Sequence, residues 1–212
     1  MVPRKIVFWE VDAQADFMLP GGKLYVPGAE KIIPNIERLV AAAQAHGAFL
    51  VSSACSHTPD DSEFSQFPPH CLRGTPGARI VPEGLARDVC TIPNDPSFPL
   101  PPDLLKHQQV VIEKQMLDVF SNPHTKTIVE KLGSETEFVV FGVATEYCVQ
   151  LAAKGLLELE RNVAIVKDAI ETINVKNGDR TIAELGERGA RFITTGEALT
   201  MLSARAPQKA FG

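Results

Sequence analysis

Short apolar runs rich in β-branched residues alternate along this chain with longer segments in which apolar residues recur at helical spacing. The clearest helical segment places Ile32, Ile36, Leu39 and Ala43 on one side, and Gly47 ends it. The pattern predicts strands at 5–11, 48–54, 109–113, 137–141, 162–167 and 190–194, and helices at 29–46, 123–132, 146–160 and 178–188.

Several of the predicted strands are almost continuously apolar, which is typical of strands covered by helices on both faces. Their regular alternation with helices predicts an α/β fold, a three-layer α/β/α sandwich around a mostly parallel, six-stranded, doubly wound sheet. A length of 212 residues fits one domain, and no repeat or linker divides the chain. We therefore expect a single domain spanning residues 1–212.

Composition narrows the class of protein. With 44% hydrophobic residues, 22% charged residues and a net charge of -5, the chain has an ordinary globular composition and no cluster of Lys and Arg that would bind nucleic acid. No apolar stretch reaches membrane-spanning length. The apolar run near the start is too brief for a secretory signal, and Glu10 and Asp12 interrupt it. We therefore expect a cytoplasmic protein with its four cysteines reduced.

The predicted fold locates a site before any motif is considered. In open parallel sheets, ligands bind beyond the carboxyl ends of the strands, near the switch in strand order. Asp12, Cys55, Lys114 and Cys148 each fall where a predicted strand ends or the next helix begins. We expect these four side chains to converge in one crevice.

Cys148 lies in the predicted first turn of a helix. The positive end of the helix dipole favours thiolate over thiol at such a position. Unpaired backbone N–H groups of the same turn can hold an oxyanion. Cys148 is therefore a candidate nucleophile with a transition-state stabiliser beside it. The alternative is a small buried residue that packs the helix.

Lys114 and Asp12 complement this thiol. A lysine near a cysteine lowers the thiol pKa, and a buried lysine needs a negative partner. Asp12 can be that partner, or the general base that takes the thiol proton and returns it to a leaving amine. Taken singly, each residue also fits a structural ion pair or a solvated strand end. Three complementary side chains on three strand ends favour catalysis.

Several segments carry a resemblance to a known family. They read VDAQADF at 11–17, PGG at 20–22, FPPHC at 67–71 followed by GTPG at 74–77, EK at 113–114, and GVATEYCV at 142–149. In this order the chain resembles the nicotinamidase branch of the isochorismatase-like cysteine hydrolases over residues 6–195. The GVATEYCV segment is highly specific to that family.

The resemblance implies a hydrolase that cleaves a C–N bond of a small amide through a thioester, with nicotinamide the best single substrate. Cys148 matches the nucleophile, Lys114 the conserved lysine and Asp12 the catalytic aspartate. The backbone N–H groups of Ala144 and Cys148 match the oxyanion hole, next to a cis peptide bond expected between Val143 and Ala144.

The resemblance also implies substrate-binding residues. Phe17 and Phe67 match positions that wall the pocket, although Phe67 stands where nicotinamidases usually have tryptophan. Phe120 is a further expected pocket residue. The segment 115–123 differs from most nicotinamidases and looks closer to other amide and carbamoyl hydrolases, so an N-carbamoyl compound is a second substrate hypothesis. Members of the family commonly associate, which implies a homo-oligomer.

A metal site is the last implication. Nicotinamidases often bind a divalent metal through an Asp-x-His pair and later histidines. Here Cys55 takes the aspartate position before His57, Glu63 stands where a further histidine is common, and His70 matches. His57, Glu63 and His70, with or without Cys55, have ligand chemistry suited to zinc. The thiol chemistry requires no cofactor, and the alternative is that both histidines only form hydrogen bonds within the proline- and glycine-rich loop at 56–84.

Two other functions compete with an amidase. Isochorismate vinyl-ether hydrolysis is disfavoured because that branch of the family lacks the nucleophilic cysteine. A non-catalytic ligand-binding module on the same fold is disfavoured because Asp12, Lys114 and Cys148 are all intact. We therefore predict an enzyme whose partner is a small amide, with no nucleic-acid or membrane partner.

Overall fold

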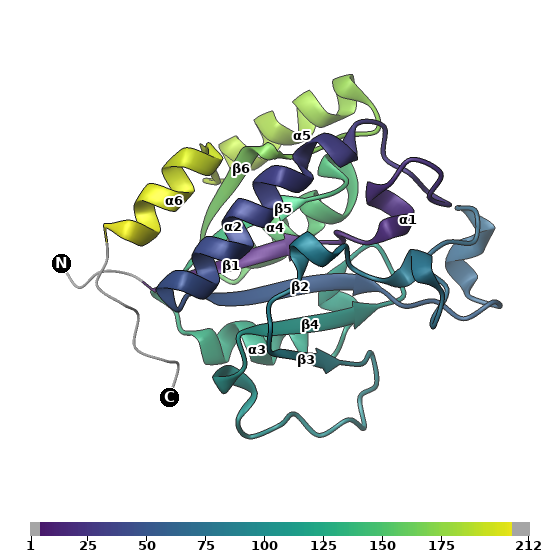
Figure 1. Cartoon of the computed structure of the whole chain (residues 1–212), viewed down its shortest axis with the longest axis horizontal. Coiled ribbons are helices and arrows are strands. Elements are labelled where there is room, and N and C mark those ends of the chain that lie inside the picture. The colour runs from purple at the N-terminus through teal and green to yellow at the C-terminus, as the bar shows by residue number, and fades with distance from the viewer. Residues whose placement is uncertain (1–4, 205–212) are drawn as a thin grey trace.

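A computed structural model describes residues 5–204 of the chain. Its described strands form one parallel sheet in the order β3-β4-β2-β1-β5-β6-β7 (Figure 1). The strands are β1 (Ile6–Val11), β2 (Phe49–Cys55), β3 (Val89–Ile92), β4 (Gln109–Lys114), β5 (Glu137–Gly142), β6 (Asn162–Ile170) and β7 (Arg191–Ile193). The helices are α1 (Ala15–Met18), α2 (Ile33–His46), α3 (Thr125–Leu132), α4 (Gln150–Glu158), α5 (Val175–Glu187) and α6 (Thr195–Ser203).

Helices cover both faces of the sheet, so the predicted three-layer α/β/α fold is confirmed. The helices α2 and α6 pack on one face, whereas α3, α4 and α5 pack on the other. In the central strand β1, Phe8 packs into the first layer and Trp9 into the second, and every residue of the strand is buried. Burial on both faces explains why this strand is almost continuously apolar.

The expected count of six strands is wrong by one. The additional strand, β3, pairs only with β4 at the edge of the sheet, and its residues Val89 and Thr91 are exposed. A half-exposed strand of four residues gives no apolar run, which is why the sequence pattern did not reveal it. The helix α6 was also not expected, although Thr194 and Glu197 form a capping box at its start.

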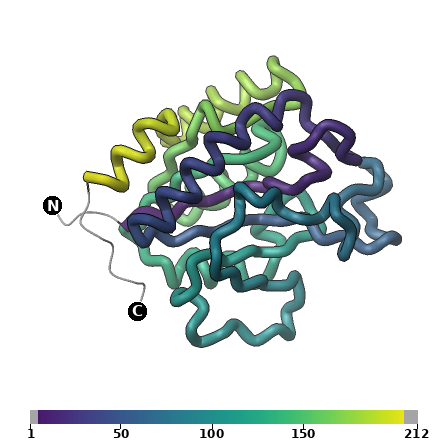
Figure 2. Tube along the Cα trace, viewed as in Figure 1, coloured from purple at the N-terminus to yellow at the C-terminus, as the bar shows by residue number. Residues whose placement is uncertain are grey.

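The strand order reverses at β1, which lies between β2 and β5. Gly142 ends β5 with a φ of +121°, and a Cβ there would lie 2.1 Å from the carbonyl oxygen of Val11. Only glycine permits that approach, which brings the following segment over the end of β1. In Figure 2 the loop after β2 lies at the same end of the sheet as α1. Among the described helices, none combines the length and the hydropathy needed to cross a membrane.

Candidate active site

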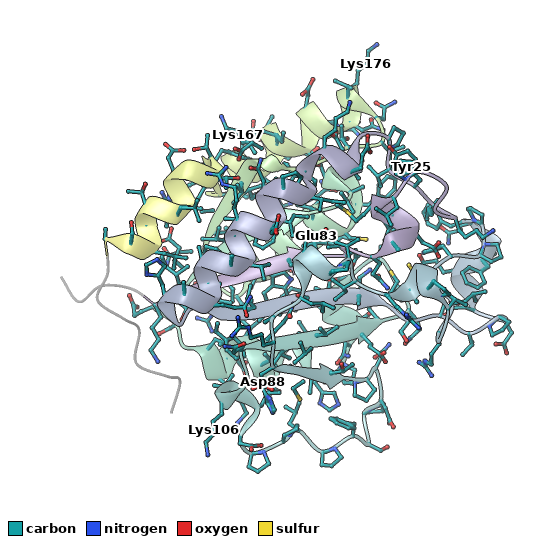
Figure 3. All side chains as sticks on the ribbon, viewed as in Figure 1. Tyr25, Glu83, Asp88, Lys106, Lys167 and Lys176 are labelled. Atoms are coloured by element: carbon teal, nitrogen blue, oxygen red, sulfur yellow. The ribbon has the colours of Figure 1, made fainter. Side chains whose placement is uncertain are left out.

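A lysine buried at the carboxyl end of the sheet organises the site. Lys106, Lys167 and Lys176 are exposed and extend into solvent (Figure 3), whereas Lys114 at the end of β4 has no exposed surface. Its Nζ lies 2.9 Å from Oδ2 of Asp12. It also lies 3.5 Å from the sulfur of Cys148. The structure therefore brings together three of the four side chains that the sequence predicted to converge, and the fourth, Cys55, lies 3.1 Å from the same Nζ.

The carboxylate of Asp12 is held by Ser53 on one oxygen and by Lys114 on the other. Asp12 follows β1 with a φ of +49°, in the left-handed region that Asp adopts more readily than most residues. The hydroxyl of Ser53 on β2 donates a hydrogen bond of 2.7 Å to Oδ1, which leaves Oδ2 for Lys114. The carboxylate is 1% exposed, so its orientation is fixed by these partners and not by solvent.

The thiol of Cys148 keeps its proton in the resting protein. Burial raises its pKa well above the usual value, which outweighs the lowering effect of the Lys114 ammonium, and a hydrogen bond to Asp12 raises it further. This differs from the expectation that the helix dipole favours the thiolate. The difference arises because Cys148 lies in a buried π-helical turn, Thr145–Val149, where desolvation opposes a charged sulfur. The nucleophile therefore needs a proton acceptor.

Burial also acts on Lys114. By itself, burial lowers the lysine pKa, but the negative charge of Asp12 and the hydrogen bond to its carboxylate raise that pKa well above its usual value. The ammonium is therefore charged, and it can stabilise negative charge that develops on sulfur.

The segment between β5 and the π-helical turn faces the same crevice. The peptide bond between Val143 and Ala144 is cis. The Thr145 N–H and hydroxyl both donate to the carbonyl oxygen of Glu171, which anchors the turn. Ala144 and Cys148 both line a cavity that Asp12 also lines.

Two of the three expected aromatic residues line this cavity. Phe17 packs against His70, with ring centroids 5.2 Å apart, and Phe67 packs edge-on against Tyr147 at 6.2 Å. Phe120 does not line the cavity. Its ring stacks on that of Trp9, with centroids 6.3 Å apart, in the helical layer that also contains Cys148, so its observed contact is one of packing and its pocket role stays a prediction. Residues that line the cavity but were not expected are Leu24, Val26, Leu117, Tyr147 and Ile173. Most of these are isolated apolar residues in loops, and no pattern along the sequence indicates that such residues line a cavity.

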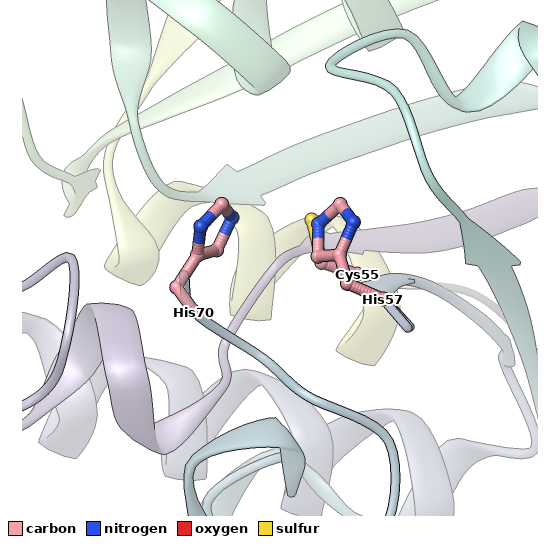
Figure 4. A group of neighbouring side chains, drawn as sticks. All are labelled: Cys55, His57 and His70. Carbon is pink, nitrogen blue, oxygen red and sulfur yellow. The ribbon is translucent and has the colours of Figure 1, made fainter. Parts of the chain in front are cut away.

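In the wall of the cavity, which Cys55 and His70 line, these two residues and His57 bring one ligand atom each to within 4.8 Å of one another (Figure 4). Nδ1 of His57 lies 3.0 Å from a carboxylate oxygen of Asp61, and Nδ1 of His70 lies 2.9 Å from the carbonyl oxygen of Pro68. Both of these oxygens can only accept, so a neutral ring carries its hydrogen on Nδ1 and keeps the lone pair on Nε2. Nε2 of His57 is buried and has no hydrogen-bond partner among residues 5–204.

Glu63 lies next to this cluster but outside it. Its Oε1 is 3.9 Å from Nε2 of His70, too far for a hydrogen bond, and no residue in the described part of the chain is a hydrogen-bond partner of its buried Oε2. Burial raises the pKa of its carboxyl group. Asp61 accepts a hydrogen bond from the Glu63 N–H and thereby fixes both this residue and His57.

Two residues of the motif at 11–17 hold the cluster in place, a role that sequence reasoning missed. The side chain of Gln14 accepts from the Cys55 N–H at 2.7 Å and donates to the Cys55 carbonyl at 2.8 Å. Oδ2 of Asp16 accepts from the Cys71 N–H at 2.7 Å, next to His70. The alternate spacing of Asp12, Gln14 and Asp16 was the available signal.

Comparisons with known proteins agree with this geometry. The model of the isochorismatase domain family matches residues 7–92 and 84–197. A nicotinamidase of Escherichia coli (strain K12) is 24% identical over 92% of this chain and 96% of its own length. A nicotinamidase of Acinetobacter baylyi is 28% identical over 78% of this chain and 80% of its own. The crystal structure of a pyrazinamidase of Pyrococcus horikoshii in complex with zinc matches with a TM-score of 0.72 and 27% identity, covering 90% of this chain and 99% of that one.

Proposed function

The chain belongs to the isochorismatase domain family, and from that premise we propose that it is a cysteine-dependent enzyme that cleaves the C–N bond of a small amide through a thioester. Its relatives identify it as a hydrolase that acts on amides. One observation supports the thiol mechanism above all others. The buried ammonium of Lys114 contacts both the carboxylate of Asp12 and the sulfur of Cys148.

In the first step, Asp12 takes the proton of Cys148 while the sulfur attacks the amide carbonyl carbon. The acceptor is required because the buried thiol holds its proton. The Lys114 ammonium stabilises the charge that develops on sulfur. The N–H groups of Ala144 and Cys148 hold the oxyanion, and loss of one such donor typically costs about 10²–10³ in turnover.

In the second step, the carbonyl re-forms and the C–N bond breaks. The nitrogen leaves as ammonia or an amine after it receives the proton from Asp12. A water molecule then gives a proton to the same carboxylate and attacks the thioester, which releases the carboxylic acid and returns the proton to the sulfur of Cys148. Each half-reaction uses Asp12 once as base and once as acid.

We also propose a bound divalent metal, with zinc the best match to the donors. The fit rests on His57, whose buried Nε2 has no hydrogen-bond partner among the described residues, and on His70, which brings a ring nitrogen to within 4.8 Å of the ligand atoms of His57 and Cys55. Imidazoles fixed through Nδ1 are the usual arrangement of metal-binding histidines. Glu63 is adjacent and has an unpaired oxygen. When bound, such an ion would supply Lewis-acid attraction for a heteroatom of the substrate.

Nicotinamide is the first substrate to test, because the curated relatives are nicotinamidases. An N-carbamoyl compound is the second. The observation that favours it is Leu117, which lines the cavity and belongs to the segment 115–123 that differs from most nicotinamidases.

The decisive experiment measures ammonia release from nicotinamide, pyrazinamide and N-carbamoylglycine by the wild-type protein, by Cys148→Ala and by Cys90→Ala. Cys90 on β3 is a half-buried thiol outside the cavity lining, so its replacement is the matched control. We expect release by the wild type and the control, and only background from Cys148→Ala. Equal release by Cys148→Ala would exclude the nucleophile, and no release from any amide would exclude the proposed function.

A further inference from the structure

We infer, building on the metal-binding part of the proposed function, that Cys55 is a thiolate ligand of the ion and connects it to the Lys114 ammonium. Cys55 stands at the end of β2, and Lys114 is its register partner on β4. Nζ of Lys114 donates to the Cys55 sulfur at 3.1 Å. One ammonium therefore contacts Asp12, the nucleophile and the third member of the metal cluster.

The position of the Cys55 sulfur is set by the fold. The side chain of Gln14 clamps both the N–H and the carbonyl of Cys55, and the residue is 3% exposed. Its sulfur lies within 4.8 Å of the ligand atoms of both histidines. Burial makes an unbound thiol an inert packing group. With the ring nitrogens of His57 and His70 beside it, the sulfur completes a set of three donors of the types that bind transition metals.

The donor types select the metal. One sulfur and two imidazole nitrogens suit Zn²⁺ or Co²⁺, whereas Mn²⁺ and Mg²⁺ prefer oxygen ligands. Binding would replace the S–H proton of Cys55 with a metal–sulfur bond and release that proton to solvent. The thiolate would then accept a charge-assisted hydrogen bond from Lys114 in place of the present bond to a thiol.

The experiment titrates metal-free protein with Co²⁺ and records the absorption spectrum. A cobalt–thiolate bond gives an intense near-ultraviolet charge-transfer band, and cobalt bound only by nitrogen and oxygen gives none. We expect the band in the wild type, its loss in Cys55→Ser and its retention in Cys148→Ser, which removes the other thiol next to Lys114. His57→Ala should weaken Co²⁺ binding by at least about 10–100-fold, so that the band appears only at higher cobalt concentration, since even residues that only support a ligand cost that much.

Each contrary result has a distinct meaning. A band that survives Cys55→Ser but disappears in Cys148→Ser would assign the metal to the nucleophile and overturn the inference. Weak visible cobalt bands without a charge-transfer band in the wild type would show a site of nitrogen and oxygen alone and would also overturn it. Absence of any Co²⁺ or Zn²⁺ binding would refute both this inference and the proposed metal. Hydrolysis that depends on Cys148 in any of these cases would leave the amidase proposal standing. Circular dichroism of each variant checks that a lost band does not reflect unfolding.

Discussion

Replacement of Asp12 by asparagine tests the charge network at its centre. The new side chain has the same shape, it adopts the left-handed backbone region as readily, and it can still accept the hydrogen bond from Ser53. What the substitution removes is the negative charge 2.9 Å from Nζ of Lys114. Both side chains are almost fully buried, at 1% and 0% exposure, so the ammonium would be left uncompensated in the interior.

The magnitude follows from that burial. Breaking a buried ion pair by removing one partner typically lowers the free energy of unfolding by about 3–5 kcal/mol. The double variant Asp12→Asn/Lys114→Met removes both charges and should be less destabilised than the single variant Asp12→Asn. Loss of the general base should separately reduce turnover by about 10²–10⁴.

Urea unfolding followed by circular dichroism measures the loss of stability, provided that the slope of the free energy of unfolding against urea concentration is the same in all variants. Ammonia release measures the loss of turnover. The reasoning is refuted if Asp12→Asn unfolds within about 1 kcal/mol of the wild type, because a typical surface ion pair is worth no more than that. It is also refuted if the double variant loses as much free energy of unfolding as Asp12→Asn and Lys114→Met lose together, because the effects of replacing two charges that interact directly are not additive.

Two further predictions concern other parts of the structure. Burial raises the pKa of Glu10 from 4.5 to about 8, despite a hydrogen bond from Ser52. The folded state therefore keeps this proton to higher pH than the unfolded chain. The free energy of unfolding should fall between about pH 4.5 and pH 8 by up to about 1.4 kcal/mol per pH unit, a slope that Glu10→Gln should reduce in urea titrations; an unchanged slope would contradict the buried proton. Phe67→Leu should raise KM with little change in stability because Phe67 lines the cavity, whereas Phe120→Leu should lower the free energy of unfolding by about 0.5–3 kcal/mol and leave KM unchanged. If Phe120→Leu instead changed KM alone, its packing role would be wrong.

The sequence was most informative where one physical signal dominated a segment. Burial on both faces made β1 and β5 almost continuously apolar, with one glutamate in each, and that pattern predicted a covered parallel sheet. The same topology predicted that Asp12, Lys114 and Cys148 would meet, because carboxyl ends of parallel strands share one edge. The edge strand β3 carried no such signal, because half of it faces solvent. The cytoplasmic location and the homo-oligomer stay predictions.

By itself, then, the sequence determined the layered fold, the edge of the sheet where the site lies and the side chains that gather there. Only the tertiary structure decided how those side chains behave. The proton stays on the sulfur of Cys148 because segments distant in the chain exclude water from it. Cys55 joins the two histidines, with Glu63 beside them, because Gln14 and Asp61 fix the backbone and ring orientations. Desolvation and the direction of a lone pair both depend on what packs around a group, and no pattern along one segment records that.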